Sequence, residues 1–587
     1  MLQALPATIA AYHAAYAAGL CPADAMTAVL TRLAAINDPG LFLHLATREE
    51  LLAQLATLPP FDVAAMPLWG IPFAVKDNID VAAMPTTAAC PAFAYTPKQD
   101  AEAVARLRAA GAIPIGKTNL DQFATGLVGI RTPHPAPINA KAPSMVPGGS
   151  SAGSAVAVGH GVVPFALGTD TAGSGRVPAA LNDIVGLKPS LGSVSARGMV
   201  PACRSLDTIS VFATTVADAH AVYRTIGGYD ADDPFARSRP VRPAAACPAA
   251  LRIGVPDDAS RRFFGDAAQE AAFDAALAQL KDLGATLVPV DLTPFNAVAA
   301  MLYAGPWLAE RFAAVESLIL GQPDALHPMT RQVIEGAANF TAVSTFQAYY
   351  RLRDLQLVTE RAMADVDVLC VPTIPTPCTL ADVAADPIGA NSQLGTYTNY
   401  VNLLDMCALA IPLGARTDGL PGGGITLIGP GGQDHRLAGI AAKALGEPSA
   451  SPVPAIQPDE LAVALVGAHM SGLPLNFQLT ERGGRFLRAT QSAPDYRLYA
   501  LPGGPPSRPG MVRVADGGVA LALEVWALPL ETVGSFLAGI PAPLGLGKTK
   551  LADGSLVTGF MCEAAGTAGA EDISHFGGWR AYIASLK

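Results

Sequence analysis

Residues 146–180 read VPGGSSAGSAVAVGHGVVPFALGTDTAGSGRVPAA, and this stretch decides the fold. A Gly-Gly-Ser-Ser loop opens it and an Ala/Val-rich segment typical of a helix follows. A strand then leads into a second loop, Thr-Ala-Gly-Ser-Gly at 171–175. Two glycine-serine loops around a helix and a strand could hold a phosphate group. Neither loop, however, has the Gly-Lys-Ser or Gly-Lys-Thr ending that a phosphate-binding loop needs. Neither loop identifies a site by itself.

A lysine upstream gives the two loops a chemical meaning. Lys76 follows the apolar segment IPFAV (71–75). A serine hydroxyl is a poor nucleophile until a base takes its proton, and no histidine lies near either loop in a usual triad motif. Lysine can be that base only if burial lowers its pKa enough to leave it neutral. The apolar strand favours such burial, whereas a solvated surface lysine is the alternative that this segment alone leaves open.

The sequence on both sides of this stretch alternates short apolar segments with helical patterns. The expected strands are 71–75, 112–116, 162–168, 251–256, 285–292, 367–373 and 424–430. A helical pattern covers 101–111, and three helices are expected in the N-terminal segment 1–60. This alternation indicates an α/β fold, a sheet covered by helices.

A proline-rich segment divides the chain. Residues 446–460, GEPSASPVPAIQPDE, contain four prolines and lack periodicity, so we expect a linker there. Short strands separated by Gly/Pro turns follow it. The sequence therefore predicts a large α/β domain at 1–445 and a small α+β domain at 461–587.

Composition excludes several function classes. The net charge of −10 gives no basic footprint for nucleic acid or an anionic membrane, and no run of about 18 apolar residues suggests a membrane span. The eight cysteines form no CxxC pair and the nine histidines show no HExxH spacing, so no metal site is expected. The N-terminus lacks the basic region of a secretory signal, and we expect a cytoplasmic protein.

Three motifs together resemble the amidase signature family of serine amidases: Lys76, the GGSSAGSA loop and the DTAGSGRVPA loop. Their separations match the family pattern, with 74 residues from Lys76 to Ser150 and 24 from Ser150 to Ser174. The resemblance covers roughly residues 25–445 and implies a mixed β-sheet core covered by helices.

The resemblance also implies roles for individual residues. Ser174 would be the nucleophile and Lys76 the general base. Ser150, which follows a cis peptide bond in this family, would relay the proton between them. The oxyanion hole would use the backbone amides of Ser174 and its neighbours Thr171, Ala172 and Gly173. Supporting contacts would come from Ser151, Asp170 and Arg176.

Further motifs resemble those of allophanate hydrolases. One is TDTAGSGRVPA, in which Gly175 replaces the bulkier residue of general amidases and would change the pocket wall. The others are QFATGLVGIRTPHPAPINA (122–140) and MLYAGPWLAERF (301–312), where Gly305-Pro306 should interrupt the helix. The resemblance implies that Tyr303 and Arg311 hold a substrate carboxylate, which matches an arginine fork. Gly126 would let the backbone approach the substrate.

The segments VGAHMSGLPLN, YRLYALPGG and EVWALP, together with IPAPLGLGKTKLADG, resemble the C-terminal domain of allophanate hydrolases, which is related in fold to γ-glutamylcyclotransferases. His469 matches the candidate catalytic histidine of that domain and could move protons near neutral pH. The alternatives are a packed loop histidine and a domain that is structural or organises a dimer.

The expected reaction is hydrolysis of allophanate (urea-1-carboxylate) without metal or cofactor. The amidase domain would release ammonia and N-carboxycarbamate, which would decarboxylate to a second ammonia and carbon dioxide. The resemblance implies a homodimer and a functional association with a urea carboxylase. One alternative is an amidase for another small carboxylated amide, such as malonamate. The other is a scaffold subunit that docks on such a carboxylase. A scaffold would be expected to lose its catalytic residues, whereas Lys76, Ser150 and Ser174 are all present.

Overall fold

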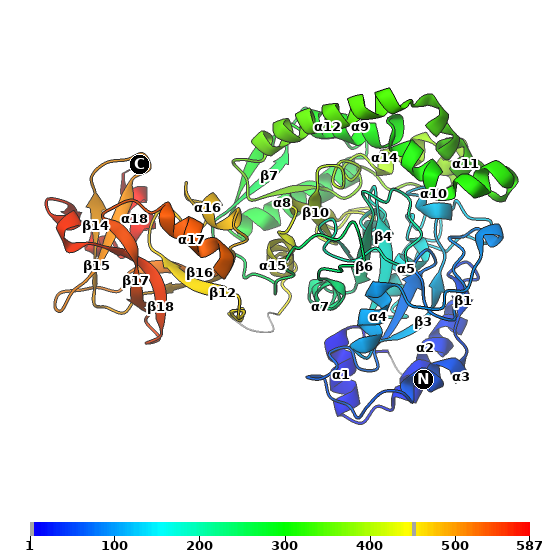
Figure 1. Ribbon diagram of the computed structural model, residues 1–587, viewed down its shortest axis with the longest axis horizontal. Helices are drawn as coiled ribbons and strands as arrows, with labels where there is room; N and C mark the ends of the chain where they lie inside the picture. Colours follow the sequence, from blue (N-terminus) through cyan, green and yellow to red (C-terminus); the bar gives the residue numbers. More distant parts are fainter. Residues whose placement is uncertain (1–4, 449–452, 587) are drawn as a thin grey trace. The chain divides into compact units, whose positions relative to one another are not determined.

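The computed structural model describes residues 5–448 and 453–586, which form two compact units (Figure 1). The larger unit contains the chain up to Arg242, Ile253–Asp282 and Leu287–Glu447. The smaller unit contains Pro243–Arg252, Leu283–Thr286 and the chain from Pro448 onward. Two short segments from the middle of the chain thus belong to the smaller unit, which no composition signal indicated. Residues 449–452 of the expected linker lie outside the described residues.

The larger unit is built on an eleven-stranded mixed sheet with the order β1-β3-β2-β4-β6-β5-β10-β11-β9-β7-β8. Its strands are β1 (Phe42–Leu45), β2 (Pro72–Lys76), β3 (Ile113–Thr118), β4 (Phe165–Asp170), β5 (Val185–Lys188), β6 (Thr208–Ala213), β7 (Leu251–Pro256), β8 (Ala285–Val290), β9 (Val368–Pro372), β10 (Met406–Ile411) and β11 (Ile425–Pro430). The mixed sheet confirms the expected fold class.

Strands β3, β2 and β4 run parallel to one another, and this arrangement positions the site. The register pairs Val75 of β2 with Leu167 of β4. The carboxyl ends of parallel strands meet at one edge of a sheet, where ligands commonly bind. Lys76 ends β2 and Asp170 ends β4, so both residues reach the same edge.

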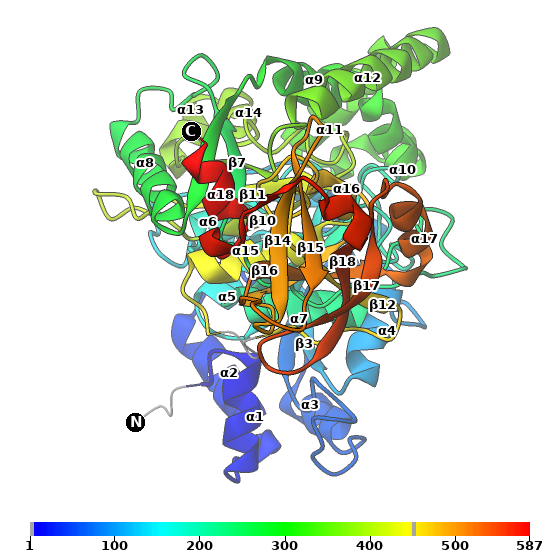
Figure 2. The ribbon, with the colours of Figure 1, turned by 90° about the vertical axis from the view of Figure 1, so that its left-hand side faces the viewer.

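Helices cover the sheet and fill the connections. They are α1 (Ile9–Ala17), α2 (Pro22–Ile36), α3 (Arg48–Leu55), α4 (Glu102–Ala109), α5 (Ala152–Gly159), α6 (Val177–Leu181), α7 (Val216–Ile226), α8 (Ala267–Asp282), α9 (Thr293–Ala304), α10 (Trp307–Gly321), α11 (Pro328–Glu335), α12 (Ala342–Ala362), α13 (Leu380–Ala385), α14 (Gly389–Leu394) and α15 (Asp434–Ala444). Figures 1 and 2 show α9 and α12 side by side. Helix α9 ends directly before Gly305-Pro306 and α10 begins directly after it, which confirms the expected interruption.

Small side chains let α5 pack closely against the sheet. The sequence AGSAVAVG provides no large residue, and all of its residues except Gly159 are buried. A Cβ on Gly153 would lie 2.5 Å from the carbonyl oxygen of Leu41, so the helix can approach only with glycine there. This close packing brings the loop before α5, which carries Ser150, against the ends of β2 and β4.

The smaller unit contains two sheets. A five-stranded sheet has the order β13-β16-β12-β18-β17 and a three-stranded sheet the order β15-β14-β19. The strands are β12 (Glu460–Leu465), β13 (Arg485–Gln491), β14 (Tyr496–Leu501), β15 (Arg508–Arg513), β16 (Ala522–Pro529), β17 (Leu544–Lys550), β18 (Leu556–Cys562) and β19 (Glu571–Asp572); the helices are α16 (Phe477–Thr480), α17 (Leu530–Ala538) and α18 (Trp579–Ser585). The smaller domain is therefore α+β, as expected.

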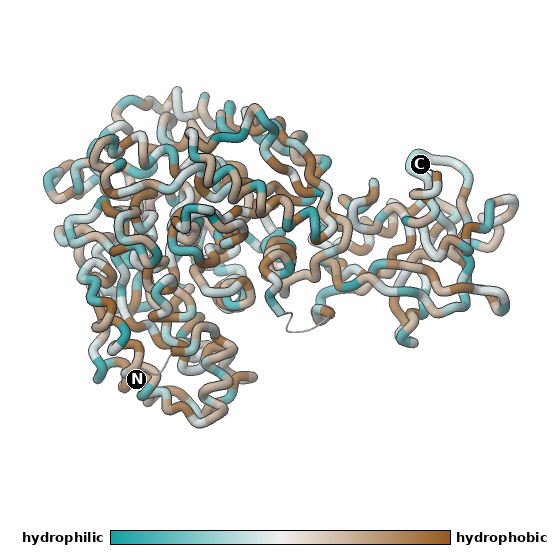
Figure 3. The backbone as a smooth tube through the Cα atoms, turned by 180° about the vertical axis from the view of Figure 1, so that it is seen from behind, coloured by the Kyte–Doolittle hydropathy of each residue, from teal (hydrophilic) through white to brown (hydrophobic). Residues whose placement is uncertain are grey.

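Hydrophobic and hydrophilic residues are interspersed along the backbone (Figure 3). Within the described residues, no helix combines the length and the apolar character that crossing a membrane requires.

Candidate active site

The structure brings Lys76 and Ser150 into direct contact. The Nζ of Lys76 donates to Ser150 Oγ over 2.7 Å and to Thr169 Oγ1 over 2.6 Å. Lys76 and Ser150 are completely buried, and Thr169 nearly so. The alternative of a solvated surface lysine is therefore wrong, because the apolar strand β2 carries Lys76 into the protein interior.

Burial prepares Lys76 to act as a base. Desolvation lowers the pKa of its ammonium group to about 7, although the nearby carboxylates of Asp121, Asp207 and Asp170 favour the charged form. A fully solvated lysine has a pKa near 10.4 and holds its proton at neutral pH. At pH 7 a large fraction of Lys76 is therefore neutral and can accept a proton.

The loop that carries Ser150 has the backbone geometry that the resemblance implies. The Gly149–Ser150 peptide bond is cis. Ser151 Oγ donates to the carbonyl oxygen of Thr169 over 3.1 Å and accepts from the amide of the same residue over 3.2 Å. Ser151 thereby ties the serine loop to β4, next to the threonine that contacts Lys76.

Ser174 lies in the loop that follows β4 and is almost completely buried. Its hydroxyl makes no hydrogen bond to Ser150 in the described structure, whereas Ser150 contacts Lys76 directly. Hydrogen bonds of catalytic groups are often long in a ligand-free enzyme and tighten when substrate binds. The relay between Ser150 and Ser174 thus remains a prediction.

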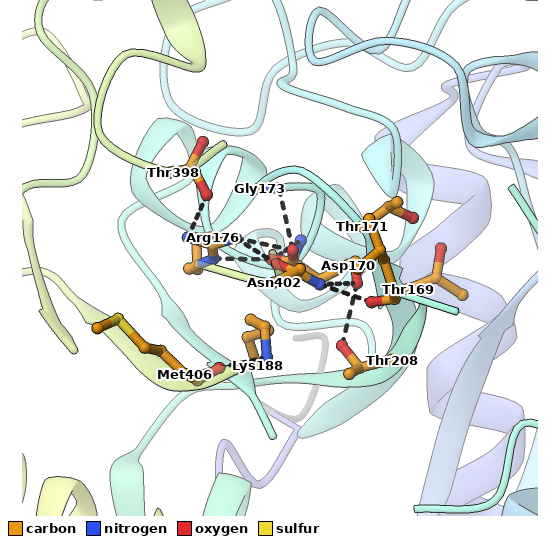
Figure 4. Close-up of polar contacts among 12 residues, drawn as sticks. Thr169, Asp170, Thr171, Gly173, Arg176, Lys188, Thr208, Thr398, Asn402 and Met406 are labelled. Carbon is orange, nitrogen blue, oxygen red and sulfur yellow. Dashed lines mark hydrogen bonds and ion pairs between the residues drawn. The ribbon is translucent and has the colours of Figure 1, made fainter. Parts of the chain in front are cut away.

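The Asp170–Arg176 pair holds the Ser174 loop in shape (Figure 4). Arg176 donates from Nε and Nη2 to the two carboxylate oxygens of Asp170, each over 2.8 Å. The same carboxylate accepts from the amides of Gly173 and Gly175 over 2.9 and 3.0 Å. Burial alone would raise the pKa of Asp170, but Arg176 and its hydrogen bonds hold this pKa below its ordinary value. An ionised Asp170 therefore fixes the loop from inside.

Two glycines of this loop are required by close packing. Gly173 has φ 138°, and a Cβ there would lie 2.4 Å from Thr398 Oγ1. A Cβ on Gly175 would lie 2.6 Å from the Cβ of Ser210 in β6. The missing side chain of Gly175 thus faces the neighbouring strand, so packing against β6 requires this glycine. Of the four amides predicted as oxyanion donors, that of Gly173 already donates to Asp170, whereas Thr171 and Ala172 lie at the start of the loop.

Arg311 is buried and forms no direct ion pair with a carboxylate of the described residues. It is 2% exposed, and within the described residues its Nε and Nη2 have no hydrogen-bond partner. Its Nη1 makes only long contacts, 3.3 Å to Thr125 Oγ1 and 3.5 Å to the carbonyl oxygen of Ala124. The guanidinium lies 5.3 Å from the ring centroid of Tyr303, so the structure brings the two predicted carboxylate-binding residues together. An unpaired buried guanidinium is costly and indicates an anionic ligand.

Gly126 connects this region to the serine loop. A Cβ at Gly126 would lie 2.6 Å from Asp121 Oδ2 and 3.1 Å from the Cδ of Arg131. Asp121 donates its amide to the carbonyl oxygen of Ser150 over 3.0 Å. Packing against Asp121 and Arg131 therefore requires glycine here, and the predicted approach to substrate remains untested.

Two residues beside the site were missed by the sequence reasoning. Thr169 lies inside the quoted stretch, two positions after Leu167 on the same face of β4, and strand periodicity could have pointed to it. Asp207 carries no motif signal. Its buried carboxylate accepts from the hydroxyl of Thr171 and from the amides of Ala202 and Cys203, and burial raises its pKa to about 6.

His469 lies in the smaller unit, in the segment after β12. Its Nε2 is 3.0 Å from Gln478 Oε1, and its ring stacks on Phe560 with centroids 5.0 Å apart. Burial lowers the pKa of the imidazole below its ordinary value, and the hydrogen bond to Gln478 opposes this effect only in part. His469 also lines a cavity of about 380 Å³ together with Gln478 and Arg508. The Nε of Arg508 is buried without a hydrogen-bond partner in the described structure.

Two family models match the chain. The model described as Amidase matches residues 24–438, a range that includes the predicted triad, Tyr303 and Arg311. The chain belongs to the amidase family. The second model, described as Allophanate hydrolase C-terminal domain, matches residues 461–584 of this amidase chain and includes His469.

Relatives and solved structures extend both matches. The amidase chain is 42% identical over 575 residues to urea amidolyase of Saccharomyces cerevisiae, covering 93% of this chain and 31% of that protein. It is 43% identical to urea amidolyase of Lachancea kluyveri, covering 89% of this chain and 30% of that one. The chain thus spans about a third of the length of these curated relatives. Allophanate hydrolase of Kluyveromyces lactis has a similar structure, with a TM-score of 0.78, 39% identity and 100% coverage of both chains.

Proposed function

We propose that this amidase hydrolyses allophanate with a triad of Ser174, Ser150 and Lys76. The observation that carries the proposal is the likeness to the allophanate hydrolase of Kluyveromyces lactis over the full length of both chains. The geometry supports it independently, because Lys76, whose pKa burial lowers to about 7, contacts Ser150, and Arg311, with two nitrogens unpartnered in the described structure, lies beside Tyr303.

In the proposed mechanism, Lys76 accepts the hydroxyl proton of Ser150 as Ser150 accepts the proton of Ser174. Ser174 Oγ attacks the carbonyl carbon of the substrate, and the amides of Thr171, Ala172 and Ser174 stabilise the oxyanion. The relay then protonates the leaving nitrogen, so that the C–N bond breaks and ammonia leaves. Water attacks the acyl-enzyme by the same relay, releases N-carboxycarbamate and restores the Ser174 hydroxyl.

Arg311 supplies the substrate preference in this proposal. Allophanate carries a carboxylate that can take two parallel hydrogen bonds from a guanidinium fork. The unpaired Nε and Nη2 of Arg311 are available for such a pair. Tyr303 would hold the guanidinium plane in position through the observed stacking contact.

We expect Arg311→Gln to lose binding of the carboxylated substrate selectively. The value of kcat/KM for allophanate should fall, and the fall should correspond to a loss of about 2–5 kcal/mol in transition-state binding free energy, because a buried charge pair is lost. Malonamate should show the same loss, whereas its neutral analogue propionamide should change little. Steady-state ammonia release with the three amides measures the effect. An equal loss for malonamate and propionamide would remove Arg311 from carboxylate recognition.

We propose that the cavity around His469 promotes decarboxylation of N-carboxycarbamate. His469 can move a proton at the cavity wall, and Arg508 can hold a carboxylate there, since its Nε has no partner in the described structure. Loss of carbon dioxide leaves a carbamate, which releases the second ammonia and the second carbon dioxide.

We expect His469→Ala to release the first ammonia at the wild-type rate and carbon dioxide more slowly. The matched control is His575→Ala, which changes an exposed histidine in the same unit. Stopped-flow measurement of carbon dioxide beside an ammonia assay separates the two steps. If both variants release carbon dioxide without a lag, the smaller domain does not catalyse decarboxylation.

The proposed function also bears on the partners and the location of this protein. We propose a functional association with a urea carboxylase, supported by the relatives named urea amidolyase, in which the matched region is joined to further sequence. We also propose a homodimer, which sedimentation velocity would test. A cytoplasmic location is proposed because no disulfide bond joins any of the eight cysteines, all of which lie among the described residues.

The direct test compares ammonia release from allophanate, biuret, malonamate and urea at equal concentration. A strong preference for allophanate supports the proposal. Equal rates for allophanate and the uncharged amides would show that the carboxylate pocket is misassigned. A preference for malonamate would favour the alternative of another small carboxylated amide.

A further inference from the structure

A cavity of about 450 Å³ lies in the larger unit, next to Tyr303. Its wall combines apolar side chains with neutral amides and hydroxyls, and the only charged residue in it, among those the structure describes, is Arg131. The lining includes Arg131, Tyr303, Gln332 and Asn399. A cavity whose wall carries one cation and no acid favours an anion.

Arg131 has no ion-pair partner within the described chain. It is 4% exposed, and its guanidinium donates to the carbonyl oxygens of Thr125 over 3.3 Å and Pro387 over 2.8 Å. Carbonyl contacts satisfy hydrogen bonds but do not neutralise the charge. Burying a cation without an ionic partner raises the free energy of the folded protein, and an anion bound in the adjacent cavity would offset this desolvation free energy.

A second cation lies just behind the wall of this cavity. Tyr303 lines the cavity, and its ring stacks on Arg311. Both arginines also contact Thr125, Arg131 through the carbonyl oxygen and Arg311 through the hydroxyl. The two guanidinium groups therefore flank one short segment of the chain, and their fields reinforce each other.

The cavity also offers an unused acceptor. Asn399 Oδ1 is buried without a hydrogen-bond partner in the described residues. A small molecule with a carboxylate and an N–H group, such as a carboxylated urea, could therefore use both Arg131 and Asn399. A neutral amide or an inorganic anion could use only one of them.

We propose that this cavity is an anion-binding antechamber in which Arg131 captures the carboxylate of a small carboxylated amide before Arg311 receives it. The inference rests on the proposed function for the identity of the substrate, but the binding of small carboxylates does not depend on turnover. Arg131 is a binding residue that acts before the chemical step, so its loss should affect KM and leave kcat nearly unchanged.

Kinetics with two variants test the role in capture. Arg131→Gln removes the charge and keeps donors for the carbonyl contacts, and Arg131→Lys keeps the charge. We expect KM for allophanate to rise at least tenfold in Arg131→Gln with kcat within about twofold. Arg131→Lys should recover most of the loss. A KM unchanged in Arg131→Gln, or a fall in kcat alone, would overturn the proposal.

A third variant leaves Arg131 and its contacts untouched. Gln332 is an exposed cavity residue on α11, so Gln332→Glu introduces a negative charge at the rim without changing the interior. We expect it to raise KM as Arg131→Gln does. The matched control is Gln322→Glu, the same substitution at an exposed position outside the cavity lining, which should leave KM unchanged. An equal KM in these two variants would overturn the proposal even if Arg131→Gln does not fold.

Binding of malonate separates this inference from the proposed function. Calorimetric titration of the Ser174→Ala protein with malonate needs no hydrolysis. We expect one bound malonate fewer per chain after adding Arg131→Gln, and the same number after adding Arg131→Lys. Unchanged stoichiometry and affinity of malonate binding in the protein with Ser174→Ala and Arg131→Gln would overturn the antechamber proposal. Loss of a malonate in a protein that does not hydrolyse allophanate would support the antechamber and contradict only the proposed reaction.

Discussion

Ser174→Ala is expected to abolish ammonia release from allophanate. The rate should fall by at least about 10⁴-fold, because Ser174 is the proposed nucleophile and only binding and oxyanion stabilisation would remain. The substitution removes one hydroxyl from a buried loop that Asp170 and Arg176 hold, so the loop should keep its shape. Ammonia release under single-turnover conditions measures the loss.

The matched control for this variant is Ser154→Ala. Ser154 is a buried serine of the neighbouring helix α5, where its hydroxyl donates to the carbonyl oxygen of Leu167 over 2.8 Å. Losing that bond should lower the free energy of unfolding by about 1–3 kcal/mol and leave turnover intact. Full activity in Ser174→Ala would reject the mechanism and favour the scaffold alternative.

Lys76→Met is expected to reduce turnover by about 10²–10⁴-fold, which is the usual contribution of a general base. Methionine fills a similar volume in the buried end of β2 and cannot accept a proton. Lys76→Arg should be equally inactive, since a guanidinium retains the charge but stays protonated at every accessible pH. An active Lys76→Arg protein would show that charge, and not proton transfer, is the contribution of Lys76.

The pH profile of the wild-type protein tests the same residue. Because burial lowers the pKa of Lys76 to about 7, the neutral base forms as the pH rises through that value. We therefore expect kcat/KM to rise between about pH 6 and 8 and then level off. Activity is lost on the acid side, where Lys76 takes up its proton. A flat profile across this window would argue against a lysine base.

Several elements could be predicted from local sequence alone. The strand expected at 251–256 agrees with β7 to the residue, because short apolar segments between turn residues have few other conformations. The helical pattern at 101–111 contains α4, and the N-terminal segment contains α1, α2 and α3. Family motifs with fixed separations predicted Lys76, Ser150 and Ser174 as a triad, and the structure places Lys76 in contact with Ser150.

Other elements were not predicted, and pairing explains why. Strand β1, FLHL, is four residues long and is partly exposed, so its pattern is weak. It exists because it pairs with β3, a strand about seventy residues later in the chain. Strands β5 and β10 pair in the middle of the large sheet, although β10 begins about 220 residues after β5 in the chain. Such non-local pairing leaves little trace in a single segment.

The sequence by itself determined which residue types were present, in which order and in which local structure: a lysine after an apolar strand, two glycine-serine loops, and a tyrosine and an arginine on either side of a helix break. Only the tertiary structure decided their physical state. The parallel pairing of β2 with β4 buried Lys76 beside Ser150 and Thr169, which lowers its pKa. Chain folding also left Arg311 and Arg131 buried without an ion-pair partner among the described residues, a property that depends on every neighbouring segment at once. Desolvation and charge balance are sums over surrounding atoms, and those atoms come from distant parts of the chain.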